Sequence, residues 1–175
     1  MSKSALKKQL ALMNREEMSE LIVDLYEARK EAKEYLDFFV DPDIESRLTK
    51  ARLAISKEAT RTSRGRARPR ITKVRQVIKN ISTLNPGVEA ECDIMAFAVE
   101  TFCGVGSDNW VKDATQKSLA KLLHDTIVLA DKGGLLNFFL PRMEGAVKKM
   151  REDKFYNPDM KSLMWTTLED TISTL

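Results

Sequence analysis

The 175-residue sequence is poor in the side chains from which most catalytic sites are built. It contains one histidine, His124, and two cysteines, Cys92 and Cys103. A single imidazole cannot supply the several histidines that most hydrolytic metal sites need, and no HExxH motif is present. Cys103 with His124 is a conceivable pair of nucleophile and base, but nothing in the sequence brings the two together. The sequence therefore predicts a protein that is not an enzyme and that carries no metal or other cofactor.

The two cysteines do not form a recognisable framework. On one helix they would lie about 16 Å apart at about 1.5 Å per residue, whereas a disulfide needs Cα atoms closer than about 7 Å. Their spacing matches no zinc or redox motif. We expect two reduced, mostly buried thiols, as in a cytoplasmic protein.

Long apolar runs are missing as well. The first residues contain no apolar stretch of signal-peptide length, and no window approaches the roughly 18 apolar residues of a membrane span. These absences predict a cytoplasmic protein without a membrane partner.

Glycine-rich phosphate loops are also absent. Neither GxxxxGK[ST] nor GxGxxG occurs. Gly104 and Gly106 lack the third glycine of the dinucleotide fingerprint and follow a predicted helix instead of a strand. We expect these two glycines to end that helix.

The chain instead carries helical periodicity almost throughout, with no alternating strand pattern and no hairpin signal. Asn14 and Glu17 have the spacing of a capping box at the start of a long second helix. Trp110 is expected to face inward on the sixth helix, and Pro141 is expected to kink the seventh helix or to mark its start. The fold class is therefore all-α, with about eight helices near residues 4–13, 14–40, 42–59, 72–84, 88–103, 108–132, 135–153 and 160–175.

Strong breaks at Pro42, Pro86 and Gly133 divide these helices into four helix pairs of roughly 40 to 47 residues, a length within the range of helical repeats. One prediction is a short HEAT- or armadillo-like α-solenoid, in which such pairs stack. The other is an irregular bundle of the same helices. Either arrangement would make residues 1–175 a single domain.

One basic segment departs from this ordinary helical composition. No Asp or Glu occurs from Ala59 to Val88, so this window carries +8 and leaves −5 for the rest of a chain whose net charge is +3. Residues 60–70 contain no large apolar side chain, and we expect them to form a basic mobile loop. The cations of the window are the candidate nucleic-acid-binding residues: Arg61, Arg64, Arg66, Arg68, Arg70, Lys73, Arg75 and Lys79.

The arginines at alternate positions from Arg64 to Arg70 suggest a partner for this segment. In an extended chain they would align about 6.6 Å apart, about twice the phosphate rise of about 3.4 Å per strand in a duplex. We therefore expect contact with the phosphate backbone of RNA or DNA, without base reading, because no aromatic residue sits among the charges. One alternative is a protein–protein interaction scaffold that binds its partner through an exposed apolar patch. The others are contact of the arginines with an acidic protein surface, including the acidic remainder of this chain, and a solvated loop without a specific role.

The first half of the chain also resembles a small family of bacterial helical proteins that is known only as a domain of unknown function. The resemblance lies in SALKKQL, in ELIVDLYEARKEAKEYLDFF, in the following DP, and in ISKE before the basic stretch. It extends more loosely beyond Val88. It implies an intracellular, single-domain helical protein, and it brings no catalytic or ligand-binding residues with it.

Overall fold

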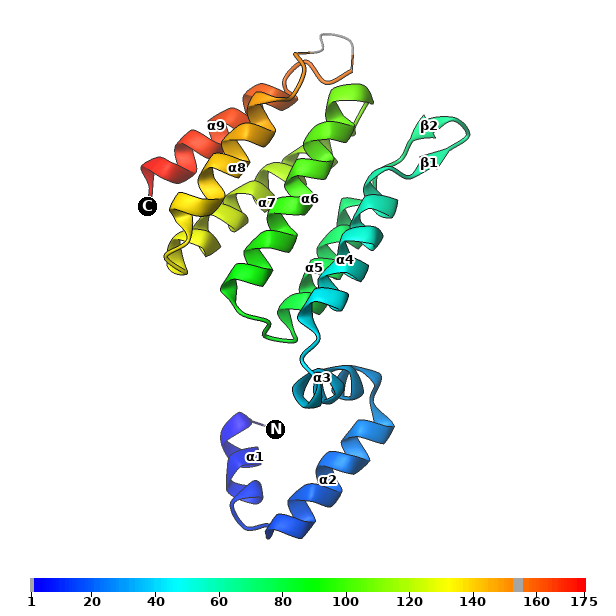
Figure 1. Cartoon of the computed structure of the whole chain (residues 1–175), viewed down its shortest axis with the longest axis vertical. Coiled ribbons are helices and arrows are strands. Elements are labelled where there is room, and N and C mark those ends of the chain that lie inside the picture. The colour runs from blue at the N-terminus through cyan, green and yellow to red at the C-terminus, as the bar shows by residue number, and fades with distance from the viewer. Residues whose placement is uncertain (1, 153–155) are drawn as a thin grey trace. The chain divides into compact units, whose positions relative to one another are not determined.

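A computed structural model describes residues 2–152 and 156–175 of the chain. These residues form nine helices and one two-stranded β-hairpin, which confirms the all-α class (Figure 1). The chain divides into two compact units, Met1–Asp43 and Ile44–Leu175. The single domain expected from the sequence stays a prediction.

The first unit contains three helices, α1 (Lys3–Leu10), α2 (Arg15–Ala28) and α3 (Lys30–Val40). The predicted capping box is confirmed at the start of α2. The amide of Glu17 donates to the side chain of Asn14, and the Glu17 carboxylate accepts from the Asn14 amide.

The single long helix predicted for residues 14–40 is wrong, because the backbone leaves the helical region at Arg29, with φ −134° and ψ 117°. The break brings the two helices together. The Tyr26 hydroxyl donates to Asp37 at 2.9 Å, and the Lys33 ammonium lies 5.2 Å from the Tyr26 ring centroid. On one straight helix, Tyr26 and Asp37 would be about 16 Å apart. No glycine or proline marks this break, so the sequence pattern gave no sign of it.

The second unit contains the hairpin and six helices in three consecutive pairs. Helices α4, α6 and α8 contact one another in succession, as do α5, α7 and α9. This two-layer stacking of helix pairs is the arrangement of a short α-solenoid. The bounds of the elements are α4 (Ile44–Ala59), β1 (Thr62–Ser63), β2 (Arg66–Ala67), α5 (Ile71–Ser82), α6 (Val88–Asp108), α7 (Asp113–Lys132), α8 (Leu136–Lys148) and α9 (Met160–Ser173).

The apolar core lies between the two layers of this unit. Its members come from all six helices and include Ile55, Phe102, Leu123 and Phe139, each at most 1% exposed. Helix α6 contacts α4, α5, α7 and α8. Ten of its 21 residues are buried, so it is the central element of the unit.

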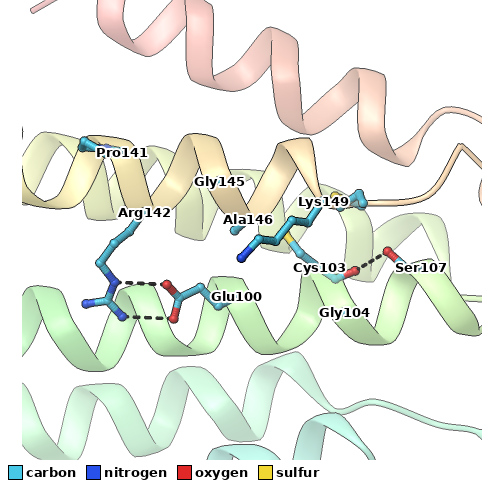
Figure 2. A pocket seen from close by; sticks show the side chains of 10 residues that line it. Glu100, Cys103, Gly104, Ser107, Pro141, Arg142, Gly145, Ala146 and Lys149 are labelled. Atoms are coloured by element: carbon cyan, nitrogen blue, oxygen red, sulfur yellow. Dashed lines mark hydrogen bonds and ion pairs between the residues drawn. The ribbon is translucent and has the colours of Figure 1, made fainter.

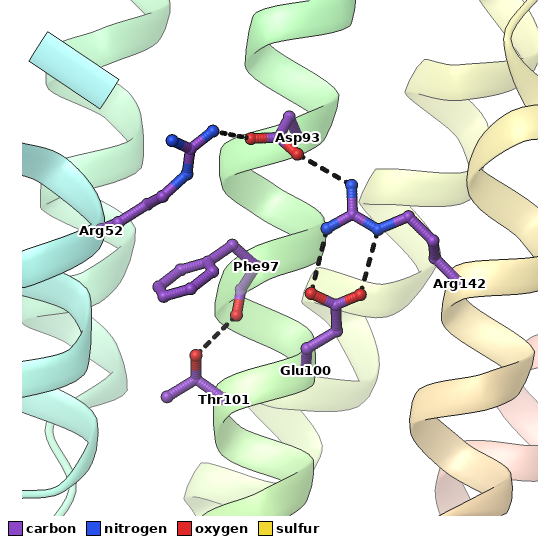
Figure 3. A network of polar contacts seen from close by, with 6 residues as sticks. All are labelled: Arg52, Asp93, Phe97, Glu100, Thr101 and Arg142. Carbon is purple, nitrogen blue, oxygen red and sulfur yellow. Dashed lines mark hydrogen bonds and ion pairs between the residues drawn. The ribbon is translucent and has the colours of Figure 1, made fainter. Parts of the chain in front are cut away.

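An ion-pair network ties three helices of one layer together (Figure 3). Asp93 on α6 accepts from Arg52 on α4 and, at 2.8 Å, from Arg142 on α8. Arg142 also makes two 3.0 Å hydrogen bonds with Glu100. Burial alone would raise the pKa of Asp93, but the hydrogen bonds from the two arginines hold it below its ordinary value. The network therefore favours the ionised carboxylate and fixes α4 and α8 against α6.

The helix end predicted at Gly104 and Gly106, and the start predicted near residue 108 for the next helix, are wrong. Helix α6 continues through Gly104 and Gly106 to Asp108, and α7 begins only at Asp113. A Cβ at Gly106 would lie 2.6 Å from the Met160 side chain, so close packing explains this glycine better than a helix stop does.

Pro141 lies inside α8, so its second predicted role, as the start of that helix, is also wrong. Helix α8 ends at Lys148, earlier than the predicted residue 153, which itself lies outside the described residues.

Candidate functional site

Residues 60–70, predicted as an irregular mobile loop, form a β-hairpin. Thr62 pairs with Ala67 and Ser63 with Arg66 in antiparallel register. The hairpin continues toward the helices, since the Arg68 amide donates to the Arg61 carbonyl at 2.7 Å. The loop predicted for residues 60–70 is therefore corrected to a hairpin, although the sequence carries no hairpin signal.

The turn of this hairpin lacks the usual sequence signal. Its two central residues, Arg64 and Gly65, have positive φ values of 52° and 72°. Two positive φ values are the mark of a type I′ turn, whose twist suits a two-residue hairpin, and Asn-Gly or Asp-Gly are its usual sequences. Arginine is uncommon in that position, which explains why sequence reasoning missed the turn.

The hairpin register places three of the predicted cations together. Because side chains alternate across a strand, Arg61, Arg66 and Arg68 project from the same face of the hairpin. All three are exposed. Arg64 lies at the tip of the turn.

At the base of the hairpin, the second unit contains a hollow of about 430 Å³. Its walls come from the hairpin, the first turn of α5, the loop between α6 and α7, and the first turn of α7. No carboxylate is among the described residues that line it. Five cationic side chains do: Arg61, Arg68, Arg70, Lys73 and Lys112.

These five cations differ in how far they are already neutralised. Arg70 makes two hydrogen bonds with Glu58, at 2.5 and 2.8 Å. The hydrogen bond from Arg70 lowers the pKa of Glu58, and the charge of Arg61 adds to the effect. The other four cations make no ion pair with any side chain that the structure describes. The hollow therefore keeps a strong positive charge.

Two helix beginnings add to this charge. The residues that precede α5 and α7 are Arg70 and Lys112, and neither supplies a side-chain cap to its helix. First-turn amides that lack such caps carry partial positive charge and can donate to an anion. The backbone and the cationic side chains therefore favour the same kind of ligand.

The remaining predicted cations lie elsewhere. Arg75 on α5 donates to the Ser118 carbonyl at 2.9 Å and lies 3.4 Å from the Asp125 carboxylate, so it joins α5 to α7. Lys79 is exposed, more than a helical turn beyond Arg75, and does not line the hollow. Of the eight predicted residues, the structure brings Arg61, Arg68, Arg70 and Lys73 to one hollow.

Trp110 and Lys112 are the site residues that sequence reasoning missed. Trp110 was expected to face inward on a helix, but it lies in the loop between α6 and α7 and is 50% exposed. It lines the basic hollow and also a second hollow of about 410 Å³, which Arg66, Asp108 and Tyr156 line as well. An aromatic side chain therefore does sit among the basic residues. The turn-forming run Ser107-Asp108-Asn109 was the signal that could have placed Trp110 in a loop.

Two buried side-chain amides hold the loop that carries Trp110: Gln116, which donates to the Val111 carbonyl at 2.8 Å, and Asn157. Asn157 accepts from the Val111 amide at 2.9 Å and from Gln116 at 3.3 Å. It donates to the carbonyls of Gly106 and Asn109, at 2.7 and 2.8 Å. Trp110 is therefore presented by a segment that is hydrogen-bonded on both sides of it.

A different hollow, of about 440 Å³, contains Cys103 between α6 and α8 (Figure 2). Burial, with a smaller effect of the Glu100 charge, raises the pKa of the Cys103 thiol to about 12. A thiol with such a pKa stays protonated near neutral pH and is a poor nucleophile. Arg142 in the same hollow is engaged with Glu100. This hollow therefore offers less chemistry than the basic one.

His124, the other residue weighed for catalysis, contacts α9. Its Nδ1 lies 2.9 Å from the Thr171 hydroxyl. Within residues 2–152 and 156–175, no three His, Cys, Asp or Glu side chains gather in a way that could hold a metal ion. That the protein is not an enzyme and needs no cofactor stays a prediction.

None of the helices in the described part of the chain is both long and apolar enough to pass through a membrane.

Fold and site together define an all-α protein with a basic, aromatic-flanked hollow at one hairpin. The chain belongs to a family of unknown function, DUF6155, which matches residues 1–166. The family resemblance seen in the sequence is thereby confirmed. No curated protein and no solved structure matches the chain.

Proposed function

We propose that the protein is a non-enzymatic module that binds the phosphate backbone of nucleic acid in the basic hollow. The observation that carries the proposal is the grouping of Arg61, Arg68, Lys73 and Lys112 around one hollow without a lining carboxylate. Arginine suits phosphate because its planar guanidinium can donate two hydrogen bonds at once. Such binding fits the cytoplasmic location expected from the sequence, which stays a prediction.

The salt dependence of binding tests this proposal. If the four unpaired cations each neutralise one phosphate, the logarithm of the affinity falls with the logarithm of salt concentration at a slope of about −3.6 for duplex DNA or about −2.8 for a single strand. Fluorescence anisotropy of labelled RNA and DNA, from about 50 to 200 mM salt, measures the slope. Failure to bind any of these nucleic acids at about 50 mM salt would overturn the proposal.

Charge reversal locates the contact. The double variant Arg61→Glu and Arg68→Glu should lose most of the affinity and flatten the salt slope. For each single reversal, Arg61→Glu or Arg68→Glu, the matched control is Lys132→Glu, because it changes the charge equally and Lys132 is exposed at the opposite end of α7, about 30 Å from its first turn. Equal losses of affinity in a single-reversal variant and in this control would mean that only net charge matters and that the hollow is not the site.

A second candidate function is a protein–protein interaction scaffold, favoured by the apolar side chains of the first unit. Helices α1 and α2 have no buried residue. On α2, Leu21, Ile22 and Leu25 are 43–50% exposed, and on α3 Phe39 is 75% exposed. A 14-residue helix is marginal without tertiary packing, so such a face is expected to be covered in the working protein.

The partner we assign to this face is a second copy of the chain. Ten large apolar side chains of the first unit are exposed by a third or more, and two copies of the chain could cover such side chains with each other in an isologous interface. The double variant Ile22→Glu and Leu25→Glu should then convert a dimer into a monomer in light scattering. A wild-type protein that is already monomeric would exclude this candidate.

A further inference from the structure

Phosphate binding alone gives no role to Trp110, although this side chain lines the basic hollow. We infer that the bound nucleic acid is single-stranded and that one of its unpaired bases stacks on the Trp110 indole while the adjacent phosphates occupy the basic hollow. This inference rests on the proposed function and specifies its ligand.

Trp110 belongs to the lining of two hollows, the basic hollow and the neighbouring hollow that contains Arg66. A strand that contacts Arg68 in the one hollow and Arg66 in the other would therefore run close to Trp110. A base attached to that strand would be within reach of the indole.

The Trp110 side chain is accessible to a ligand. Half of the Trp110 surface is exposed, and its indole N–H has no hydrogen-bond partner among the described residues. The indole of Trp110 thus offers an open aromatic face to a stacked base. Its N–H lies in the plane of the ring and can donate only to a neighbouring group of the strand, not to the stacked base itself.

The loop that contains Trp110 is fixed in position. The residues on either side of Trp110 are fixed by Asn157, which bonds the Asn109 carbonyl and the Val111 amide. Val111 is itself 1% exposed. An exposed aromatic ring on an anchored loop loses little conformational entropy when a ligand binds, so the ring is suited to stacking.

The choice of a single strand follows from the chemistry of stacking. In a duplex the bases are already stacked on one another, so an indole reaches a base only where the strand is unpaired. Proteins that combine a basic groove with aromatic platforms bind single strands with little sequence preference. Asp108 lines the second hollow, but it lies 3.6 Å from Arg151, which offsets its charge.

Tryptophan fluorescence tests the inference directly. The chain has two tryptophans, and Trp165 is an exposed side chain on α9 that lines neither of these hollows. In a Trp165→Phe background, Trp110 becomes the sole indole. Titration with a thymidine oligomer of about 12 nucleotides should quench its emission, and a duplex of equal length should bind at least tenfold more weakly.

Two substitutions separate stacking from charge. Trp110→Leu should weaken single-strand binding about ten- to hundredfold, whereas Trp110→Phe, which keeps an aromatic face, should recover most of the affinity. Each variant is first checked for an unchanged urea unfolding transition, so that a folding defect is not read as a binding defect. Equal affinity for duplex and single strand, or an unaffected Trp110→Leu protein, would overturn the inference.

The outcomes also separate this inference from the proposal on which it rests. If the phosphate proposal fails, neither strand form binds, and the Arg61→Glu, Arg68→Glu variant changes nothing. If only the stacking inference fails, that variant still abolishes binding while Trp110→Leu does not. A titration with thymidine mononucleotide distinguishes a free nucleotide from a strand. If the mononucleotide bound as tightly as the oligomer, the ligand would be a free nucleotide and the assignment of a single strand would be overturned.

Discussion

Asn157 shows how much a single buried amide can control at the candidate site. Its side chain takes part in four hydrogen bonds with residues 106–116, and it is 6% exposed. A buried backbone group that loses its hydrogen-bond partner lowers the free energy of unfolding by about 1–3 kcal/mol. The loop that presents Trp110 therefore depends on a residue nearly fifty positions away in the sequence.

The first prediction concerns this residue. Asn157→Leu should lower the free energy of unfolding by about 2–4 kcal/mol, because it leaves the Val111 amide and the carbonyls of Gly106 and Asn109 without their partner. Urea denaturation measures the loss. In the Trp165→Phe background, the fluorescence anisotropy of Trp110 should also fall, since the loop gains freedom. A stability loss without any change in anisotropy would mean that Asn157 supports the core and not the loop.

Residues such as Asn157 and Trp110 mark the limit of sequence reasoning at the site. The charge pattern was sufficient to find Arg61, Arg68, Arg70 and Lys73, because a run of cations without acids is visible locally. The approach of the α6–α7 loop to the hairpin is a long-range contact, and no local pattern encodes it. For the same reason Lys112 could not be assigned to the site, and the engagement of Arg75 with α7 could not be foreseen.

At the scale of elements, sequence periodicity predicted the helices better than their ends. The apolar stripes reflect burial, and most of them reappear as buried faces, as in α5 with Val74, Ile78 and Ile81. The error at the end of α6 arose because the signal was a single residue type. Gly104 and Gly106 were interpreted as a helix stop, but glycine is also required where two helices approach closely, and only the fold distinguishes the two uses.

The second prediction uses these two glycines as a matched pair on α6. Gly104→Ala should raise the free energy of unfolding by about 0.5–1 kcal/mol, because alanine is the better helix former and nothing lies within 4 Å of the added Cβ. Gly106→Ala should be less stable than Gly104→Ala by about 1–3 kcal/mol, because its Cβ would lie 2.6 Å from the Sδ and Cε atoms of the buried Met160, whose side chain would have to move. Chemical denaturation of the two single variants measures both effects. If Gly106→Ala were as stabilising as Gly104→Ala, the close contact between α6 and Met160 would be refuted.

The third prediction concerns the ion-pair network that joins α4, α6 and α8. Asp93→Asn should destabilise the protein by about 1–3 kcal/mol near neutral pH, because Arg52 and Arg142 lose their shared carboxylate. The pKa of Asp93 is lower in the folded protein than its ordinary value of 3.8. Its contribution is therefore fully present above that ordinary value and is lost as the pH falls through the folded pKa.

Urea unfolding at about pH 7, 5 and 3 checks the direction of this effect. The difference in the free energy of unfolding between wild type and Asp93→Asn should stay constant from pH 7 to 5 and shrink toward pH 3 and below. Asp131→Asn is the control, since Asp131 is exposed at the end of α7 and makes no ion pair with a described residue. A gap that widens on acidification would contradict the lowered pKa.

At the scale of the whole molecule, the two units differ in how they are stabilised. Apart from Phe38, every apolar side chain that is buried among the described residues belongs to residues 44–175. The hairpin, the basic hollow and Trp110 all lie in that second unit as well. Composition and periodicity could not reveal this division, because α2 carries as regular an apolar stripe as the helices of the core.

The fourth prediction follows from this difference. A chain cut to residues 44–175 should unfold cooperatively, with a melting temperature within about 4 °C of the full chain, because it keeps the core cluster. It should also keep its affinity for a thymidine oligomer. Residues 1–43 alone should give little helical circular dichroism, since their helices of 8 to 14 residues bury only Phe38 and such short helices are marginal in water. If the 44–175 chain failed to fold, the first unit would have to supply stability to the second. If it folded but no longer bound the oligomer, phosphate binding would also need residues of the first unit.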